Sequence, residues 1–373
     1  MTISDSPPLP LKQALGPARE QAAAFLRALA PSARVVVFCH FDADGLAAGA
    51  LFGRGLARMG FTGVQVVHSD RGENAFSAGA RQRLAALRPD ALIVTDLGVH
   101  RAGVLPGVPT LYVDHHRPDG EPEDVASTIV LAYGWDPIPA SAWLAYDLLS
   151  PLADIEDLAW IAAVGTISDL GEKAPWDALP EIRKRWSGKW LREAVSLTNA
   201  ARRGSAFDVA TPLRMLMEAD GPRAIAEDDA LGADRLRAYR AEVQAELAIA
   251  RKQAPIFSAD QPWALVPLDS GCQIHPLIAQ QWRTRLPKFA VIAANRGYLP
   301  GVVAFSARTQ RTDLVLPALL RAPDIGADDE ASFGRGHDQA SGGHLPRELF
   351  NRLMDALGFD ARARVPEDSA PSA

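Results

Sequence analysis

The stretch VVVFCHFDADGL, at residues 35–46, constrains the fold more than any other part of the chain. It begins with apolar residues, as does a strand that is buried on both faces of a parallel sheet. His40, Asp42 and Asp44 follow at every second position, so their side chains would point the same way in an extended chain. Ligand sites in open α/β sheets lie at the carboxyl ends of strands, so the stretch predicts a ligand site. The alternative is that Asp42 and Asp44 only shape the turn and cap the following helix.

Two later apolar segments end in acidic or imidazole side chains in the same way. They are residues 91–95, followed by Asp96, and residues 110–113, followed by Asp114, His115 and His116. Because parallel strands bring like ends together, these side chains should gather on one edge of a sheet. Asp169, after an apolar helix expected at residues 158–164, is a further candidate. Repulsion among so many carboxylates calls for a cation, and carboxylate and imidazole ligands together suit Mn²⁺, Mg²⁺ or Fe²⁺.

The order of the expected elements indicates two α/β domains. The chain has 373 residues, more than one core usually holds. Strands that alternate with helices predict an N-terminal doubly wound parallel sheet, and a helix expected at residues 228–253 would join it to a smaller α/β domain. The expected strands are residues 35–38, 64–68, 91–95, 110–113 and 127–131 in the first domain, and 263–268, 289–294 and 301–307 in the second.

Residues 333–344, FGRGHDQASGGH, form a glycine-rich stretch in the second domain. We expect a loop here, between helices at residues 314–320 and 347–357. Glycines beside histidine and arginine can cradle an anion, whereas the alternative is a flexible loop with two incidental histidines.

Composition limits the possible classes of protein. The absence of eighteen consecutive apolar residues argues against a membrane span, and the N-terminus lacks the pattern of a signal peptide. Only Cys39 and Cys272 are present, which fits a reducing cytoplasm. The net charge of −6 argues against broad duplex binding, but it allows a local basic groove for a small or single-stranded anionic substrate.

Residues 175–221 contain Trp176, Trp186, Trp190 and the basic run EIRKRW. We expect a helical cap with an exposed charged face, because runs of charge are usually solvated. The alternative is a wall that stacks bases or guides phosphates.

Four short motifs carry a family resemblance: HFDADG, TDLG, DHH and GTISD, in that order. They resemble the motifs of the DHH phosphoesterase superfamily. RGHDQASG resembles the GGHxxAxG motif of the accompanying DHHA1 domain, with Arg335 in place of the usual first glycine, and FSAR resembles that domain's strand with a substrate-binding arginine. The resemblance implies a DHH catalytic domain with a helical cap at residues 1–225, a linker helix at 226–255, a DHHA1 substrate-binding domain at 256–361 and a disordered tail at 362–373.

The resemblance also implies roles for individual residues. One metal would be held by His40, Asp42 and Asp96, and the other by Asp44, Asp96, His115 and Asp169, so that Asp96 bridges them. Asp114 would orient His115 or His116, and His116 would face the scissile phosphate. The residues expected to hold the substrate's terminal phosphate or sugar-phosphate are Arg308, Arg335, Gly336, His337, Ser341 and Gly342. The expected cofactors are two Mn²⁺ ions, with Mg²⁺ or Co²⁺ as substitutes.

Within the superfamily, we expect a RecJ-like exonuclease or nanoRNase-type phosphodiesterase that degrades short or single-stranded nucleic acid to mononucleotides. About a dozen residues follow the last expected helix, so the additional domains of long bacterial RecJ proteins are not expected there. One alternative is a phosphodiesterase or phosphatase for small nucleotides, such as cyclic di-AMP, its linear dimer or 3′-phosphoadenosine 5′-phosphate. Another is a non-catalytic nucleotide sensor. The expected protein is cytoplasmic, without a membrane partner, and a monomer or homodimer.

Overall fold

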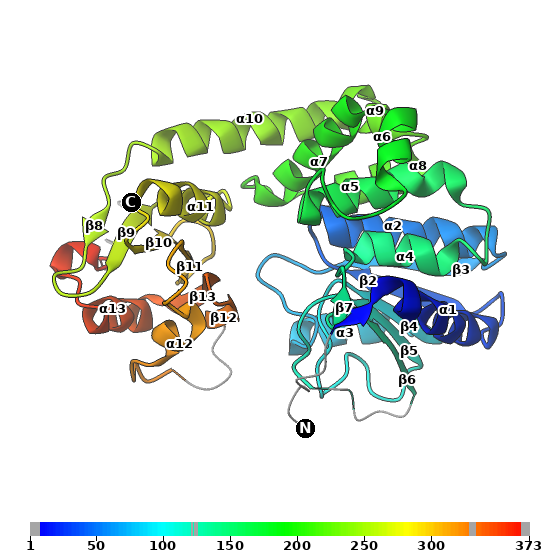
Figure 1. Cartoon of the computed structure of the whole chain (residues 1–373), viewed down its shortest axis with the longest axis horizontal. Helices are drawn as coiled ribbons and strands as arrows, with labels where there is room; N and C mark the ends of the chain where they lie inside the picture. The colour runs from blue at the N-terminus through cyan, green and yellow to red at the C-terminus, as the bar shows by residue number, and fades with distance from the viewer. Residues whose placement is uncertain (1–7, 121, 123–125, 328–332, 367–373) are drawn as a thin grey trace. The chain divides into compact units, whose positions relative to one another are not determined.

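The structure is a computed structural model that describes residues 8–120, 122, 126–327 and 333–366. The chain divides into two compact units. The first unit runs to Arg202 and resumes from Phe207 to Ala238, and the second consists of Arg203–Ala206 and the chain from Tyr239 onward. Helix α10 (Ala233–Ala250) leads from the first unit into the second (Figure 1). No helix among the described residues is both long and apolar enough to span a membrane.

The first unit is built on five parallel strands in the order β3-β2-β4-β5-β6, which confirms the predicted parallel sheet. The central strands are buried and mostly apolar, because helices cover both of their faces. Val36 and Phe38 pack with α3, whereas Cys39 faces α2 on the other side of the sheet (Figure 1). The strands are β2 (Arg34–Cys39), β3 (Gly63–His68), β4 (Ala91–Thr95), β5 (Thr110–Asp114) and β6 (Ser127–Leu131).

The helices of the first unit form the two outer layers and the cap. Those beside the sheet are α1 (Leu11–Arg27), α2 (Ala43–Arg58), α3 (Ala78–Ala86), α4 (Ser141–Leu149) and α5 (Ala159–Leu170), with a short 3₁₀ turn at Glu156–Leu158. Helices α6 (Leu179–Trp186), α7 (Gly188–Arg203), α8 (Ala210–Glu218) and α9 (Pro222–Glu227) follow. A separate two-stranded pair joins β1 (Leu9–Pro10) to β7 (Trp135–Asp136).

The second unit has a mixed six-stranded sheet in the order β12-β13-β11-β10-β9-β8. Its strands are β8 (Ile256–Phe257), β9 (Trp263–Leu268), β10 (Ala290–Asn295), β11 (Val302–Thr309), β12 (Phe333–His337) and β13 (Ala340–Pro346). Its helices are α11 (His275–Arg285), α12 (Leu316–Arg321), α13 (Arg347–Ala356) and a 3₁₀ turn at Ala361–Ala363.

The glycine-rich stretch at residues 333–344 is a β-hairpin, so the expectation of a loop was wrong. Strand β13 pairs with β11 and brings Gly342 opposite Ser306. A Cβ atom on Gly342 would collide with the carbonyl oxygen of Phe305, so only glycine lets the two backbones approach this closely. The glycines therefore permit close strand pairing here.

The expected tail at residues 362–373 is partly ordered. Val365 donates its backbone N–H to Asn351 on α13 at 2.8 Å, and Asn351 donates back to the Val365 carbonyl at 3.0 Å. Arg364 also pairs with Asp355 at 2.8 Å. Residues 362–366 therefore pack on α13, and residues 367–373 lie outside the described part of the chain.

Candidate metal centre

The side chains after β2 converge, although not by the expected extended geometry. Strand β2 ends at Cys39, and α2 begins at Ala43. Asp42 caps α2 by accepting a hydrogen bond from the Gly45 N–H at 3.1 Å, and Asp44 lies within the first turn of the helix. Asp42 is thus both a cap and a neighbour of His40, whose Nδ1 lies 3.2 Å from its Oδ2. The two explanations offered for this stretch are therefore compatible.

Three overlapping groups of possible metal ligands lie at the carboxyl edge of the sheet in the described part of the chain. In each group, the ligand atoms all lie within 4.8 Å of one another. The groups are His40, Asp42 and Asp96; Asp44, His115 and Asp169; and Asp96, His115 and His116. The first two are the sets expected for the two ions, except that Asp96 is absent from the second.

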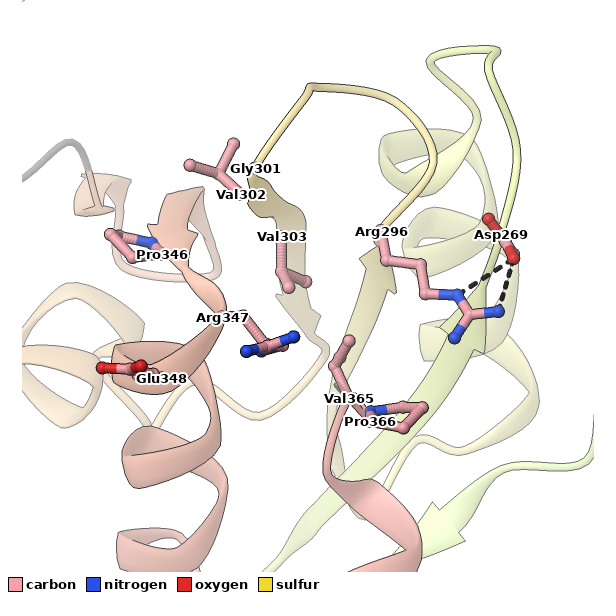
Figure 2. Close-up of a pocket in the computed structure, with 10 residues that line it drawn as sticks. All are labelled: Asp269, Arg296, Gly301, Val302, Val303, Pro346, Arg347, Glu348, Val365 and Pro366. Atoms are coloured by element: carbon pink, nitrogen blue, oxygen red, sulfur yellow. Dashed lines mark hydrogen bonds and ion pairs between the residues drawn. The ribbon is translucent and has the colours of Figure 1, made fainter. Parts of the chain in front are cut away.

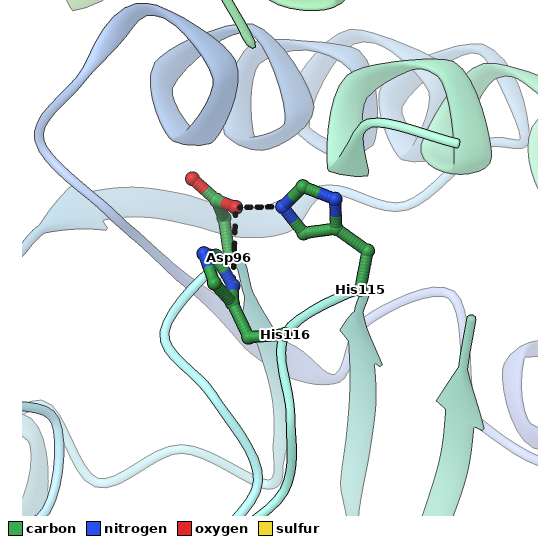
Figure 3. A group of neighbouring side chains, drawn as sticks. All are labelled: Asp96, His115 and His116. Atoms are coloured by element: carbon green, nitrogen blue, oxygen red, sulfur yellow. Dashed lines mark ion pairs between the residues drawn. The ribbon is translucent and has the colours of Figure 1, made fainter. Parts of the chain in front are cut away.

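Asp96 lies between the two groups and contacts both. Its Oδ2 is 3.5 Å from Nδ1 of His40, and its Oδ1 is 3.5 Å from Nε2 of His115 (Figure 3). The residue is buried and adopts a left-handed backbone conformation, with φ at +63°. Such a conformation is strained for an aspartate and is characteristic of functional sites. This arrangement supports the bridging role expected for Asp96.

Asp169 reaches the centre from a helix and not from a loop. The expected helix ended at residue 164, but α5 continues to Leu170 and Asp169 lies in its last turn. The helix ends at Gly171, where φ is +80°. Asp169 Oδ2 lies 3.8 Å from Nδ1 of His115. The apolar residues of α5 pack this helix against α2 and so deliver Asp169 to the strand edge.

Helix α4 contributes a contact that the sequence did not reveal. The backbone N–H groups of Ser141 and Ala142 donate to the two carboxylate oxygens of Asp44, at 2.8 and 2.9 Å. The Ser141 hydroxyl also donates to Asp96 Oδ1 at 2.9 Å. A helix N-terminus stabilises negative charge, so α4 helps to hold two buried carboxylates together. The sequence signal was a serine at the start of the helix expected at residues 140–149.

His116 is oriented by Asp114. Asp114 Oδ1 accepts from the His116 backbone N–H at 2.7 Å and lies 3.0 Å from the His116 Nδ1, while Oδ2 accepts from Gly98 N–H at 2.7 Å. The His116 side chain remains 51% exposed, unlike that of His115, at 9%. Of the two histidines, His116 is therefore the one that Asp114 positions and that a ligand can reach.

Charge is unevenly distributed among the carboxylates. Burial raises the pKa of Asp44 well above its ordinary value, and the Asp96 carboxylate adds to the effect. Burial likewise raises the pKa of Asp169. For Asp42, burial would raise the pKa, but His40 and Arg202 outweigh it and lower the pKa. Protonation of Asp44 is favoured where no cation compensates its charge, so a divalent cation fits this donor set.

Neighbouring carboxylates raise the pKa of the two inner histidines, His40 and His115. Burial alone would lower the pKa of His40, but Asp42 and Asp96 raise it to about 10. Burial would also lower the pKa of His115, but Asp96, Asp44 and Asp169 raise it to about 10. Protons therefore occupy the metal-free centre and compensate the carboxylates, and a metal ion would displace them.

The residues expected to bind substrate in the second unit lie on neighbouring strands. Arg308 is the penultimate residue of β11 and donates to the carbonyls of Ala307 and Ser341 at 2.9 and 3.0 Å. Ser341 is buried on β13, opposite Gly336 on β12, and His337 is exposed at the turn of the hairpin. Gly342 follows Ser341 on β13, and Arg335 lies on β12. The strand pairing brings these residues together, and their role in binding remains a prediction.

A pocket of about 690 Å³ lies elsewhere in the second unit (Figure 2). Gly301, Val302 and Val303 line it at the start of β11, whereas Arg308 lies near the end of this strand. Arg296 and Asp269, paired at 2.6 Å, form its polar side. No predicted substrate residue lines this pocket.

No family model matches the sequence, and no curated protein matches it. Several solved structures are similar in fold. An exonuclease RecJ bound to manganese is 22% identical, with a TM-score of 0.67 over 94% of this chain and 95% of that one. A Thermus thermophilus RecJ in complex with Mn²⁺ is also 22% identical, with a TM-score of 0.65, and this chain spans 55% of its length. The DHH domain of a protein described as a member of a ribosomal protein family is 12% identical, with a TM-score of 0.68 over 94% of this chain and 92% of that one.

These similarities extend over nearly the whole chain. The chain therefore has the fold of the RecJ and DHH-domain structures, with a five-stranded parallel sheet in its first unit.

Proposed function

We propose that the protein is a divalent-metal-dependent phosphodiesterase that degrades short or single-stranded nucleic acid to mononucleotides. The observation that carries the proposal is the pair of ligand groups at the sheet edge, with Asp96 in contact with both. Mixed carboxylate and imidazole ligands fit Mn²⁺, with Mg²⁺ or Co²⁺ as substitutes. The RecJ structures that share this fold were solved with Mn²⁺ or Mg²⁺.

His40, Asp42 and Asp96 would hold one ion, and Asp44, Asp96, His115 and Asp169 the other. When bound, two such ions activate water as a nucleophile and neutralise charge on a phosphate. The protein's own contribution is to fix the ligands. Asp96 joins the groups, and the α4 N-terminus fixes Asp44 through Ser141 and Ala142.

His116 would support the scissile phosphate. Its Nδ1 lies 3.0 Å from Asp114, and an Nδ1–H group would donate to this carboxylate. Burial would lower the pKa of His116, but Asp114 and Asp96 raise it, which favours the imidazolium form. In that form Nε2 also carries a proton and would donate a hydrogen bond to a phosphate oxygen as charge develops there. Asp114 would therefore be a positioning residue for His116.

The hairpin of the second unit would hold the substrate's terminal phosphate. Arg308 and His337 would supply a cationic and an imidazole donor, Ser341 would supply a hydroxyl, and Arg335 is the further candidate on β12. Gly336 and Gly342 would let the strands that carry these residues pair closely. We propose a cytoplasmic enzyme that acts as a monomer or homodimer.

The decisive experiment is a substrate panel. The purified protein with Mn²⁺ is given a length ladder of 5′-labelled DNA and RNA, cyclic di-AMP, its linear dimer, 3′-phosphoadenosine 5′-phosphate and pyrophosphate. We expect mononucleotides from the oligonucleotides and little release from pyrophosphate. Preferential hydrolysis of a small nucleotide would replace the proposed substrate, and strong hydrolysis after dialysis against excess EDTA would contradict the metal-dependent mechanism.

The matched control is Asp119→Asn. Asp119 is an exposed carboxylate of the first unit, and it pairs only loosely with His100, at 3.5 Å. This variant should retain wild-type turnover, whereas Asp96→Asn should lose nearly all activity.

A further inference from the structure

Beside the metal centre lie two phenylalanines that the proposed chemistry does not use. Phe41 falls between His40 and Asp42, and its ring centroid is 4.2 Å from that of His40. Phe207, far away in the sequence, lies with its ring 5.3 Å from Phe41 in an edge-on arrangement. Both side chains are only partly buried. An aromatic surface therefore adjoins the first ligand group.

Each ring also has a guanidinium over it. Arg71, from the loop after β3, lies 5.2 Å from the centroid of Phe207, and Arg202, on α7, lies 5.8 Å from that of Phe41. Arg202 is held by Asn199, to which its Nε donates at 2.9 Å, and Asn199 in turn donates to Ser168 at 2.9 Å. Ser168 precedes Asp169, so this arginine is fixed relative to the metal centre.

Phe207 is held in an unfavourable conformation. Its backbone φ is +51°, in the left-handed region that bulky residues rarely occupy. Strain of this kind persists where the surrounding structure determines it, and it is common at ligand sites. The conformation keeps the ring against Phe41 and Arg71.

We propose that Phe41 and Phe207, with Arg71 and Arg202, form a subsite for the nucleobase next to the scissile phosphate. The inference rests on the proposed phosphodiesterase function and specifies its substrate. Nucleobases stack on aromatic rings and guanidinium planes with little base specificity, because every base has a π-face. Inorganic pyrophosphate has no base and would gain nothing from this surface. Nucleotide substrates of any sequence would be favoured, and base-free phosphates would not.

The tryptophans that the sequence singled out fit this role less well. Trp176 is buried and stacks on Trp143 at 5.6 Å, so it belongs to the core of the first unit. Trp190 contacts Lys189 and Arg223, and no ring contact joins it to a metal-ligand residue in the described part of the chain. The stacking surface adjoins the sheet edge instead.

A comparison of substrates tests the subsite. The protein is assayed on a trinucleotide and on the same trinucleotide with an abasic residue at either end. For the wild type, we expect kcat/KM on the intact trinucleotide to exceed that on one of the two abasic trinucleotides by about tenfold or more. Phe207→Leu should reduce this preference to less than threefold. Phe207→Tyr, which keeps an aromatic ring, should retain the wild-type preference.

Fluorescence provides a readout that does not depend on turnover. The probe is 2-aminopurine riboside 5′-monophosphate, which has no diester bond, titrated with protein in Mg²⁺ and in EDTA. Stacking should quench its fluorescence with the wild type and not with Phe207→Leu. Phe76→Leu is the matched control, because Phe76 contacts His100 at 4.9 Å in the same unit and should leave both readouts unchanged.

The outcomes separate the two proposals. Equal kcat/KM on intact and abasic trinucleotides, with no quenching, would overturn the stacking subsite and leave the phosphodiesterase intact. Failure to cleave any diester, including bis(p-nitrophenyl) phosphate, would overturn the proposed function, and the quenching would then decide the subsite alone. If Phe207→Leu does not fold, Arg71→Ala removes the guanidinium over the same ring and should lower the preference at least threefold. A preference unchanged in that variant would overturn the subsite.

Discussion

At the scale of single residues, Asp96 is the point on which the candidate centre depends. Its two oxygens face different histidines, and its strained backbone keeps them there. A ligand shared by two ions has no substitute, because each ion would lose a donor and the ions would no longer be held together.

We expect Asp96→Ala to cost more activity than the loss of a ligand in only one group. Turnover at saturating Mn²⁺ should fall by at least a thousandfold, and elemental analysis should find less than one ion per chain. Asp169→Ala should reduce activity while leaving one ion bound. Near-normal turnover of Asp96→Ala would show that the centre has been assigned incorrectly.

The pKa shifts of the inner histidines predict how stability changes with pH. Burial alone would lower the pKa of His40 and of His115, but the carboxylates raise both to about 10. A raised pKa means that the folded protein binds the proton more tightly than the unfolded chain, whose histidines titrate near 6.5. This stabilisation is complete below about pH 6.5 and disappears as the pH rises through about 10.

The measurement is the melting temperature of the metal-free protein in EDTA between pH 6 and 10. We expect a decline with pH that is shallower in His40→Gln, which lacks one of the two groups. Equal slopes in the wild type and the variant would contradict the assignment of the proton to His40.

At the scale of elements, close packing of α5 against α2 and α4 places Asp169 beside the strand ends. Gly165 makes this possible. A Cβ at this position would lie 2.6 Å from Asp44 Oδ1 and would collide with the side chain of Ala142. The helix can approach the buried carboxylate only where the side chain is absent.

Gly165→Ala should therefore displace α5 and weaken the centre. Overpacking of this kind typically costs about 1–3 kcal/mol of stability, and it should also lower Mn²⁺ affinity, measured by calorimetric titration. Gly134→Ala is the control, because a Cβ there would meet nothing within 4 Å. If Gly165→Ala binds Mn²⁺ as tightly as Gly134→Ala does, the packing of α5 is not what positions Asp169.

At the scale of the whole molecule, the two units are expected to divide the work. The first unit contains the candidate metal ligands, and the strands β11, β12 and β13 of the second contain the expected phosphate contacts. A division of this kind predicts that the second unit can be impaired without loss of metal.

Arg308→Ala or His337→Ala should lower kcat/KM by roughly tenfold to a hundredfold, since a charge-assisted bond to phosphate contributes about 1.5–3 kcal/mol. The loss should be greatest on the shortest substrates, which have few other contacts. Metal content should be unchanged. Arg296→Ala, in the same unit but in the pocket of Figure 2, is the matched control. Loss of bound Mn²⁺ from His337→Ala would place the hairpin among the metal ligands instead.

The sequence alone determined the parallel sheet and most of the side chains that gather at its edge. Apolar strands with acidic or imidazole residues at their ends are local patterns, and the direction of parallel strands brings those ends together whatever the distant contacts are. The proximity of His40, Asp42, Asp96 and His115 was therefore predictable, whereas their roles as metal ligands and the orienting role of Asp114 stay predictions.

Only the tertiary structure decided the features that depend on packing between distant elements. The length of α5, which carries Asp169, and the contact of the α4 N-terminus with Asp44 arise where helices pack together. The hairpin at residues 333–344 forms because β13 has β11 to pair with, and glycines alone would indicate a loop. The Phe41–Phe207 contact joins residues that are 166 positions apart in the sequence, and no local sequence pattern predicts a contact between residues so far apart. Long-range packing selects among local conformations of similar energy, which is why these parts could not be predicted from the sequence.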